Sequence, residues 1–433
     1  MAVGHSVDPA RWQSVFEGLM ARVAGRFARV EPRRWARAFV LGLLADLPRK
    51  NCWTIAEHVG NASPAGMQHL LSRASWDADQ VRDDMRTFVV DHLGDEDAVL
   101  VVDETGDLKK GTHSVGVQRQ YTGTAGRIEN SQVAVYLVYS ATAGHAAIDR
   151  RLYIPRSWTQ DPDRCRAAGI PDELRFATKP ALATEMIAQA LDAGVPARWV
   201  AGDEVYGGDP HLSVELESRQ IGYVLAVSRK RPIPTRAGVF RAGVLAHGLP
   251  KRAWQRLSAG AGAKGHRFYD WAQVDIDAPT AGSGYRWLLI RRNRRTGELA
   301  FYRCYSARPV PLSSLVEVAG RRWTVEETFQ AAKGLAGLDE HQVRRWTSWH
   351  RWTTLAMLAH AFLAVTAAIE RASGPSSPDL APLTCGEIRR LFAGLLVQPV
   401  RDLGHQLRWS AWRRRHQARA RTSHYQRQAA LHP

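Results

Sequence analysis

Apolar residues recur at two different spacings along the chain, and the spacing changes near residue 95. Up to that point they follow helical periodicity, first over residues 10–30 and 34–46 and then in CWTIAEHVG and AGMQHLLSRAS, which a break at NASP separates. This pattern predicts a helical N-terminal domain over residues 1–95. The last two segments are equally typical of a helix-turn-helix that binds DNA and of an ordinary helical hairpin.

From residue 98 the pattern is that of short buried strands. The apolar runs AVLVVDETG, SQVAVYLVYSAT, AAIDRRLYIPRSW, ARWVAGDEVYG and GYVLAVS are interrupted by the amphipathic segments KPALATEMIAQALDAG and PHLSVELESRQ. The order strand, hairpin, helix, strand, helix, strand predicts an α/β sheet of mixed direction. We assign residues 96–228 to the first part of this core.

The next segment, residues 229–310, is rich in Arg, Gly, Pro and aromatic residues. Its runs HRFYDWAQVDI, YRWLLIRRN and LAFYRCYS predict antiparallel strands, and the turn RRTGE separates the last two. We therefore predict a basic, β-rich insertion subdomain here. Helical spacing returns over residues 311–345, which would complete the core.

Residues 346–433 predict a helical C-terminal region that ends in an Arg-rich, mobile segment. The long apolar run from Trp352 to Ile369 lies in this region. It contains His360 and is bracketed by Arg351 and Glu370, which favours a buried helix over a membrane span. We therefore expect no membrane partner.

The 433-residue chain carries a formal net charge of +17, and this charge is unevenly distributed. Residues 229–310 hold seventeen Lys and Arg against four Asp and Glu, and residues 401–433 hold eight Arg against one Asp. The first fifty residues are also basic, with nine against four, so the remainder of the chain is net acidic. Such segregation indicates a polyanionic partner, with nucleic acid as the first candidate.

Composition excludes two classes of protein. A hydrophobic content of 45% is ordinary for a globular protein and excludes disorder across the whole chain. The four cysteines are scattered and lack metal-ligand spacing, which excludes a disulfide scaffold. This cysteine usage is typical of a reducing cytosol.

Two predicted strands end in the same way, with an aspartate, a glutamate and a turn. The aspartates are Asp103 in VVDETG and Asp203 in AGDEVYG. Either one alone is typical of a helix cap or a turn. If both strands end at one edge of an α/β sheet, the two carboxylates share a crevice and could hold divalent cations. We favour the first acid of each pair because it is nearer the rigid strand, with Glu104 and Glu204 as supporting groups.

A third carboxylate lies in RRWTVEETFQAAKG. In one continuous helix, Arg322, Glu326, Phe329 and Lys333 would share a face, whereas Glu327 would point about 100° away. This row fits a metal-binding glutamate with two cations aimed at phosphates. It fits a surface row of ion pairs equally well.

Three carboxylates suffice for phosphodiester chemistry with two metal ions. Two hard cations about 3.5–4 Å apart activate a water and stabilise the leaving 3′ oxygen. Mg²⁺ prefers oxygen ligands, so the chemistry requires neither His nor Cys. A site made of Asp103, Asp203 and Glu326 would therefore take two Mg²⁺ ions, with Mn²⁺ as a substitute.

These motifs resemble those of bacterial insertion-sequence transposases of the DDE superfamily, in particular the cut-and-paste group with an all-β insertion in the catalytic domain. The resemblance covers most of residues 98–365 and rests on VVDETGDLKKGTHSVGVQRQYTGTAGRIENSQVAVYLVY, on AGDEVYGG followed by GYVLAV, and on GRRWTVEETFQAAKGLAGLDEHQVRRWTSWHRWTTLAMLAHAFL. It implies a ribonuclease H-like core. Asp103 would be on its first strand, Asp203 after its fourth strand, and Glu326 on the helix that follows the β insertion.

The related group also carries a Tyr-Arg-Glu-Lys signature around the third acid. Arg322, Glu326 and Lys333 match its spacing, but Ala319 stands at the Tyr position. The resemblance implies that Arg322 and Lys333 orient phosphates. One phosphate contact of the signature is absent or comes from another residue.

Further candidate DNA contacts fall in two segments. The cations of KKGTHSVGVQRQYTGTAGRIEN would contact DNA or belong to a polar loop that packs beside Asp103. In the insertion, cations would contact phosphates and an aromatic would stack on an unpaired base, which is worth about 1–3 kcal/mol. Alternatively, the insertion aromatics form its own core. The candidates are Lys109, Lys110, Arg119 and Arg127 in the first segment, and Trp254, Trp271, Trp287, Arg291 and Arg292 in the second.

The resemblance implies a bacterial, cytoplasmic transposase. It would bind the terminal inverted repeats of its element, cut the DNA with metal-bound water and join the freed 3′-hydroxyl to target DNA. Synapsis of two ends in this family requires at least a homodimer. Two alternatives stay open, namely a non-catalytic DNA-binding protein derived from such an enzyme and a structure-specific nuclease that cuts but never joins.

Overall fold

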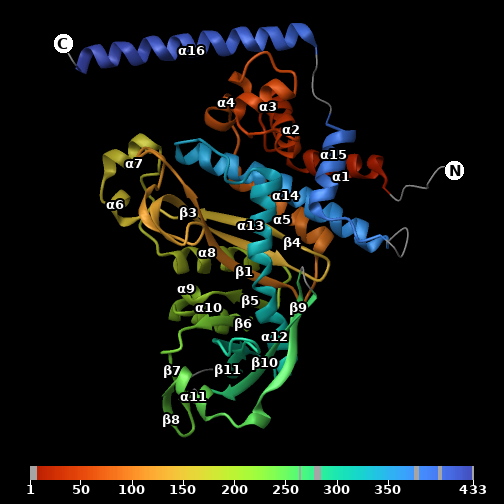
Figure 1. Cartoon of the computed structure of the whole chain (residues 1–433), viewed down its shortest axis with the longest axis vertical. Coiled ribbons are helices and arrows are strands. Elements are labelled where there is room, and N and C mark those ends of the chain that lie inside the picture. The colour runs from red at the N-terminus through yellow and green to blue at the C-terminus, as the bar shows by residue number, and fades with distance from the viewer. Residues whose placement is uncertain (1–6, 263–264, 277–283, 375–379, 398–401, 432–433) are drawn as a thin grey trace, which may run out of the picture. The chain divides into compact units, whose positions relative to one another are not determined.

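The computed structural model describes residues 7–262, 265–276, 284–374, 380–397 and 402–431 (Figure 1). The chain forms two compact units. The first comprises Met1–Asp84, Ala331–Val343 and Thr347–Pro433, and the second comprises Met85–Gln330 and Arg344–Trp346. The five-segment division with boundaries at residues 95, 228, 310 and 345 stays a prediction.

The first unit is helical. Asp8 accepts hydrogen bonds from two backbone N–H groups at the start of its first helix, and Asn51 forms a capping box with Thr54 at the third. The third and fourth helices pack against each other and against the second. A DNA-binding role for this pair stays a prediction. The N-terminal helices are α1 (Pro9–Ala24), α2 (Val30–Leu44), α3 (Cys52–His58), α4 (Ala65–Ser72) and α5 (Ala78–Leu93).

The long apolar helix α14 (Trp346–Ala372) is long and apolar enough to cross a membrane by length and composition alone. However, 94% of its most apolar window is buried inside the protein. Its Trp352 meets Phe39 edge to face, and its Arg351 donates hydrogen bonds to the Ala74 and Trp76 carbonyls. This burial confirms the predicted buried helix.

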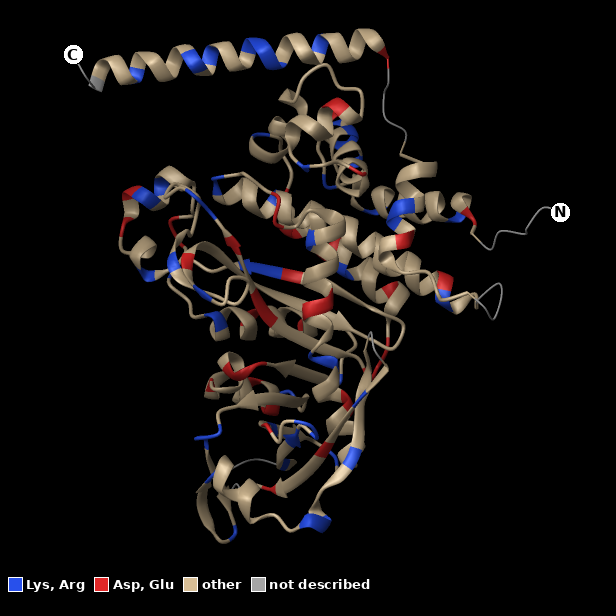
Figure 2. Cartoon of the chain, viewed as in Figure 1, with Lys and Arg blue, Asp and Glu red and all other residues tan. Residues whose placement is uncertain are grey.

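Two further helices, α15 (Cys385–Leu395) and α16 (Leu403–Leu431), belong to the first unit. The Arg-rich end, which we predicted to be mobile, forms a helix with Arg residues spaced along its length (Figure 2). Its first turns are anchored, because the buried Trp409 donates to the Asn61 carbonyl at 2.7 Å and Arg413 pairs with Glu57 at 2.6 Å. The later turns are exposed.

The second unit is built on a ten-stranded sheet of mixed direction. The strand order is β2-β3-β1-β5-β6-β12-β11-β10-β9, and β4 also pairs with β3. β1 is antiparallel to β3 and parallel to β5, and β5 is parallel to β6. The series β4-β3-β1-β5-β6 confirms the predicted α/β class with a ribonuclease H-like core. Its strands are β1 (Val99–Leu108), β3 (Arg127–Ser140), β4 (His145–Leu152), β5 (Trp199–Gly202) and β6 (Gly222–Val227).

The predicted insertion is β-rich and continues the same sheet, because β12 pairs antiparallel with β6. A separate two-stranded hairpin precedes these strands and leads into a short helix. A buried apolar cluster joins β6 to the insertion and includes Val227, Leu288, Ile290 and Phe301. The elements are β7 (Pro232–Thr235), β8 (Gly238–Arg241), α11 (Ala242–Gly248), η1 (Lys251–Ala253), β9 (Gln255–Gly262), β10 (Gly265–Asp275), β11 (Tyr285–Arg292) and β12 (Leu299–Ser306).

The segment that follows the first acid contains a strand, although its sequence has no strand period. β2 (Gln118–Thr122) forms a hairpin with the start of β3, in a register that pairs Gln118 with Ser131 and Thr122 with Arg127. Gly106 lies beneath this hairpin, where any Cβ would collide with the Thr122 side chain. The second half of the segment is therefore a hairpin of β2 with β3, whereas residues 109–117 form the loop that the sequence also allowed.

Helices cover both faces of the core sheet. α8 packs against β1, β3 and β4, and α12 packs against β1, β5 and β6. The row predicted as one helix around the third acid is in fact two, since α12 ends at Arg321 and α13 begins at Thr324. At the junction the Trp323 N–H donates a hydrogen bond to the Gly320 carbonyl, three residues earlier, as in a 3₁₀ turn. The remaining helices are α6 (Arg156–Thr159), α7 (Pro162–Ala168), α8 (Lys179–Asp192), α9 (Glu204–Gly207), α10 (Pro210–Ser218), α12 (Leu312–Arg321) and α13 (Thr324–Ala336).

Candidate active site

Asp103 and Asp203 lie side by side at one edge of the parallel part of the sheet. The β1–β5 ladder ends at the pair Val102↔Gly202, and each aspartate is the next residue of its chain. Our expectation that the first strand ends at Asp103 is wrong, because β1 continues to residue 108 along β3. Only the neighbouring strand ends here, and this leaves the second aspartate free to begin α9.

The surroundings of both aspartates disfavour negative charge. Burial and the nearby Asp203 carboxylate raise the pKa of Asp103 to about 7. Burial and the Glu104 carboxylate raise the pKa of Asp203, even though its Oδ1 accepts a hydrogen bond from the Val205 N–H at 2.8 Å. Desolvation and like charges both favour the protonated form. A bound cation would offset this repulsion and favour the ionised form of the pair.

Glu326 reaches this pair through Arg322. The Arg322 guanidinium lies 3.7 Å from Asp103 Oδ2 and 3.3 Å from Glu326 Oε1. Arg322 sits in the turn between α12 and α13, and Glu326 lies in the first turn of α13. Three carboxylates and one arginine singled out from sequence thus lie in one place, although they are separated by more than 200 residues along the chain.

Glu104 points to the opposite face of β1 from Asp103, as strand geometry requires. Its carboxylate accepts hydrogen bonds of 2.6 Å from the Lys179 ammonium group at the start of α8 and from the hydroxyl of the buried Tyr206 in α9. It therefore ties β1 to α8 and α9 and adds negative charge beside Asp203. The sequence suggested Glu104 as a supporting group but gave no sign of Lys179 or Tyr206.

Glu327 turns away from the site, as the helical spacing predicts. Its Oε2 lies 3.5 Å from Nε2 of His145, whose Nδ1 is 2.7 Å from the Thr328 hydroxyl. The hydrogen bond with His145 lowers the pKa of Glu327. Adjacent glutamates of one helix thus have different surroundings, which makes Glu327 a matched control for Glu326.

The three carboxylates suit a hard divalent cation by their chemistry, but they are not arranged as a metal centre. Within the described ranges, no group of three or more His, Cys, Asp and Glu side chains is placed to hold a metal ion. The Arg322 guanidinium bridges Asp103 and Glu326 instead. The half-buried, mutually repelling aspartates nevertheless favour a cation. Arg322 would have to move aside for Glu326 to share it.

The predicted phosphate contacts near the acids differ in exposure. Lys333 lies two turns beyond Glu326 on the same face of α13. Around the β2–β3 hairpin, Lys110 and Arg119 are exposed and Lys109 is half-buried. Arg127 is 75% exposed but pairs with a neighbour, Glu129, at 2.9 Å.

Two predicted DNA contacts of the insertion are wrong. Trp271 is 1% exposed and Trp287 is 6% exposed, so neither ring can stack on a base. Both sit on strands whose inner face packs in the insertion, where Trp271 lies beside Tyr302 and Trp287 stacks on Tyr285. The alternative that these aromatics form the core of the insertion holds for both tryptophans.

The other three insertion candidates are half-buried and engaged with neighbours. The Arg292 guanidinium lies 4.1 Å from the centre of the Trp254 ring and pairs with Asp270 at 3.0 Å. Arg291 lies over the Tyr269 ring at 4.7 Å. These contacts hold the two arginines against the insertion. Its exposed cations lie at other positions.

Comparison with known proteins places the chain in a family. Residues 22–244 match the family described as DDE superfamily endonuclease. Over 190 residues the chain is 32% identical to the "Probable transposase for insertion sequence element IS701" of Microchaete diplosiphon, which covers 43% of this chain and 47% of that protein. The chain thus matches about half the length of this curated relative.

Among solved structures, the piggyBac transposase in a synaptic complex with hairpin DNA covers 89% of this chain and 79% of its own, with a TM-score of 0.43 and 11% identity. The fold is assigned from the sheet topology and not from this likeness. The family match includes both aspartates and spans more than half of the residues. The chain therefore belongs to the DDE superfamily endonuclease family.

Proposed function

We propose that the protein is an insertion-sequence transposase, which cuts DNA at the ends of its element and joins the cut ends to target DNA. The observation that carries the proposal is the position of Asp103 beside Asp203 at one edge of the core sheet, with Arg322 between Asp103 and Glu326. Membership in an endonuclease family supports the cutting step. The similarity to a probable transposase supports the joining step.

The carboxylates have a direct part in this chemistry. Asp103, Asp203 and Glu326 would hold two divalent cations, and these would supply an activated water and stabilise the leaving oxygen. We propose Mg²⁺ as the ion, with Mn²⁺ as a substitute, because all three ligands offer hard oxygens. Glu104, fixed by Lys179 and Tyr206, would keep the two aspartate-bearing elements in place.

The cations around the acids would position the DNA. Arg322, in the turn before α13, and Lys333, two helical turns beyond Glu326, would orient phosphates once Arg322 leaves the carboxylates. Lys110, Arg119 and Arg127 would contact the backbone from the β2–β3 hairpin, with Lys109 beside them. In the insertion, the half-buried Trp254, Arg291 and Arg292 would make secondary contacts.

The proposed partners are the terminal inverted repeats of the element, target DNA and a second copy of the chain. A bacterial protein with these partners would act in the cytoplasm. The DNA that flanks the gene would identify the substrate, since inverted repeats that enclose the gene would define the ends to be bound.

A cleavage and joining assay tests the proposal. The full chain is incubated with a repeat-containing duplex and Mg²⁺ or Mn²⁺, and in parallel with precut ends and target DNA. We expect nicks at the repeat ends and joined products. Absence of any cut product with either ion would favour a non-catalytic DNA-binding protein, and cutting without joining would favour a structure-specific nuclease.

A further inference from the structure

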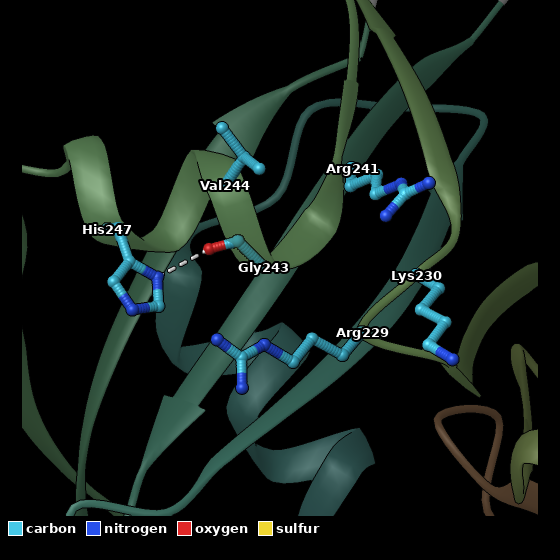
Figure 3. Close-up of a pocket in the computed structure, with 6 residues that line it drawn as sticks. All are labelled: Arg229, Lys230, Arg241, Gly243, Val244 and His247. Carbon is cyan, nitrogen blue, oxygen red and sulfur yellow. Dashed lines mark hydrogen bonds between the residues drawn. The ribbon is translucent and has the colours of Figure 1, made fainter.

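A basic pocket opens where the chain leaves the last strand of the core and enters the insertion. Its volume is about 550 Å³. The residues around it come from the end of β6, the β7–β8 hairpin and α11, and Figure 3 shows their side chains. They are Arg229, Lys230, Arg241, Gly243, Val244 and His247.

The pocket has cations but no counter-charge. Arg229, Lys230 and Arg241 are exposed, and in the described part of the chain none of them has a carboxylate at ion-pair distance. This differs from Arg292, which is paired with Asp270 in the same insertion. Three unpaired cations in one concave site repel one another, so the site would favour an anion with several oxygens.

Backbone contacts fix the main chain around the pocket. The Ala242 N–H donates to the Arg231 carbonyl and the Gly243 N–H donates to the Arg229 carbonyl, which closes the hairpin onto the strand end. His247 Nδ1 lies 2.6 Å from the Gly243 carbonyl, and in Figure 3 the Arg229 side chain extends toward this ring. The geometry is therefore fixed by the fold rather than by the flexible side chains alone.

Gly243 is required for this geometry. A Cβ at this position would lie 2.6 Å from Cγ and 2.8 Å from Nε of Arg229. Any larger residue would displace the Arg229 side chain. By contrast, a Cβ at Gly248, at the end of the same helix, would meet nothing within 4 Å.

The pocket belongs to the same edge of the sheet as the acidic site. β6 is parallel to β5 and pairs Leu225 with Gly202, the residue before Asp203. Arg229 lies in the turn that begins two residues after the end of β6. The Arg231 guanidinium also donates to the Gly208 carbonyl at 3.3 Å, next to the helix that Asp203 caps.

We propose that this pocket binds backbone phosphates of the DNA that the acidic site cuts, a few nucleotides from the scissile phosphate. The inference rests on the proposed function and assigns it an anchoring site that contains none of the proposed metal ligands. Arg229, Lys230 and Arg241 would supply charge-assisted hydrogen bonds to phosphate oxygens. Such contacts are independent of base sequence and set the register of the DNA.

The salt dependence of DNA binding tests this proposal. The variant Arg229→Gln/Lys230→Gln/Arg241→Gln is compared with Lys251→Gln/Arg252→Gln/Arg295→Gln, which removes the same charge from exposed positions of the insertion outside the pocket. The probe is a short duplex of mixed sequence without divalent ions, with inorganic phosphate as a competitor at constant ionic strength. A plot of the logarithm of the DNA-binding constant against the logarithm of salt concentration has a negative slope. Each lost phosphate contact lowers the magnitude of this slope by about 0.9.

We expect the pocket variant to lower this slope by about two to three and the control variant to leave it nearly unchanged. Equal slopes for the two variants would overturn the proposal. It would also be overturned if inorganic phosphate bound to the pocket but the pocket variant bound the duplex with wild-type affinity. The failure of the proposed function would look different, because the wild-type chain would then not cut DNA at all.

A pair of glycine variants separates geometry from charge. Gly243→Ala keeps every cation but displaces Arg229, so we expect weaker duplex binding than in Gly248→Ala. Circular dichroism and thermal unfolding verify that both variants fold. Wild-type affinity in a folded Gly243→Ala protein would show that the placement of Arg229 is irrelevant and would count against the pocket.

Discussion

At the residue scale, the site depends on carboxylates that are held where negative charge is unfavourable. Asp103 and Asp203 could be singled out from sequence because each directly follows an apolar run. Lys179 and Tyr206 could not, since their meeting with Glu104 depends on how α8 and α9 dock on β1. No local period or spacing encodes that contact.

The raised pKa of Asp103 predicts a pH-dependent cost to stability. Its pKa is about 7 in the folded chain against an ordinary value of 3.8, so the folded state binds more protons than the unfolded state between these values. Stability contributed by this group is therefore lost as pH rises through that window. Asp103→Asn should raise the free energy of unfolding by about 2 kcal/mol more at pH 8 than at pH 5.

Urea unfolding at the two pH values, with a chelator present, measures this difference. Asp172→Asn, at an exposed position, serves as a control for the loss of one carboxylate. If Asp103→Asn changed the free energy of unfolding equally at both pH values, ionisation of Asp103 would not destabilise the folded chain.

Tyr206→Phe should impair both stability and cleavage. The change removes a buried hydrogen bond of 2.6 Å to Glu104, which should cost about 1–2 kcal/mol and loosen the carboxylate beside Asp203. Tyr223→Phe is a matched control, since its buried hydroxyl donates to Glu217 at the same distance. We expect similar losses of stability from both changes but slower DNA cleavage only from Tyr206→Phe. Equal cleavage rates in the two variants would deny Glu104 a supporting role.

At the element scale, the third acid depends on a junction that the sequence pattern does not reveal. The spacing of Arg322, Glu326 and Lys333 predicts one helix, but α12 and α13 are separate and Arg322 lies in the turn. The turn is consistent with the close packing of α12 on β9 just before it. There, Arg267 donates to the carbonyls of Ala259 and Gly320.

Gly320→Ala should therefore destabilise the second unit. A Cβ at this position would lie far inside contact distance of the Ala259 carbonyl oxygen, which is backbone and cannot swing aside. Overpacking of this kind costs about 1–3 kcal/mol. Gly334→Ala, in α13, meets nothing within 4 Å and should instead stabilise by up to about 1 kcal/mol. Thermal unfolding compares the two, and a neutral Gly320→Ala would exclude a tight α12–β9 contact.

At the scale of the whole molecule, the net charge of +17 is unevenly distributed along the chain. The concentration of cations in residues 229–310 could be counted from sequence, but their partners could not. Arg292 is neutralised by Asp270, whereas Arg229 and Arg241 come together only because the β7–β8 hairpin folds back on the strand end. Trp271 and Trp287 were predicted to contact DNA because aromatic content alone does not distinguish core rings from exposed ones.

The central claim is that Asp103, Asp203 and Glu326 act as one metal-dependent site for DNA cleavage. The most direct measurement is the rate of strand cleavage, with Mg²⁺ or Mn²⁺, by Glu326→Gln and by Glu327→Gln in the adjacent position. We predict that Glu326→Gln loses cleavage but still binds DNA, and that Glu327→Gln, whose carboxylate faces His145, retains most of the rate. Cleavage by Glu326→Gln at nearly the wild-type rate would contradict the account.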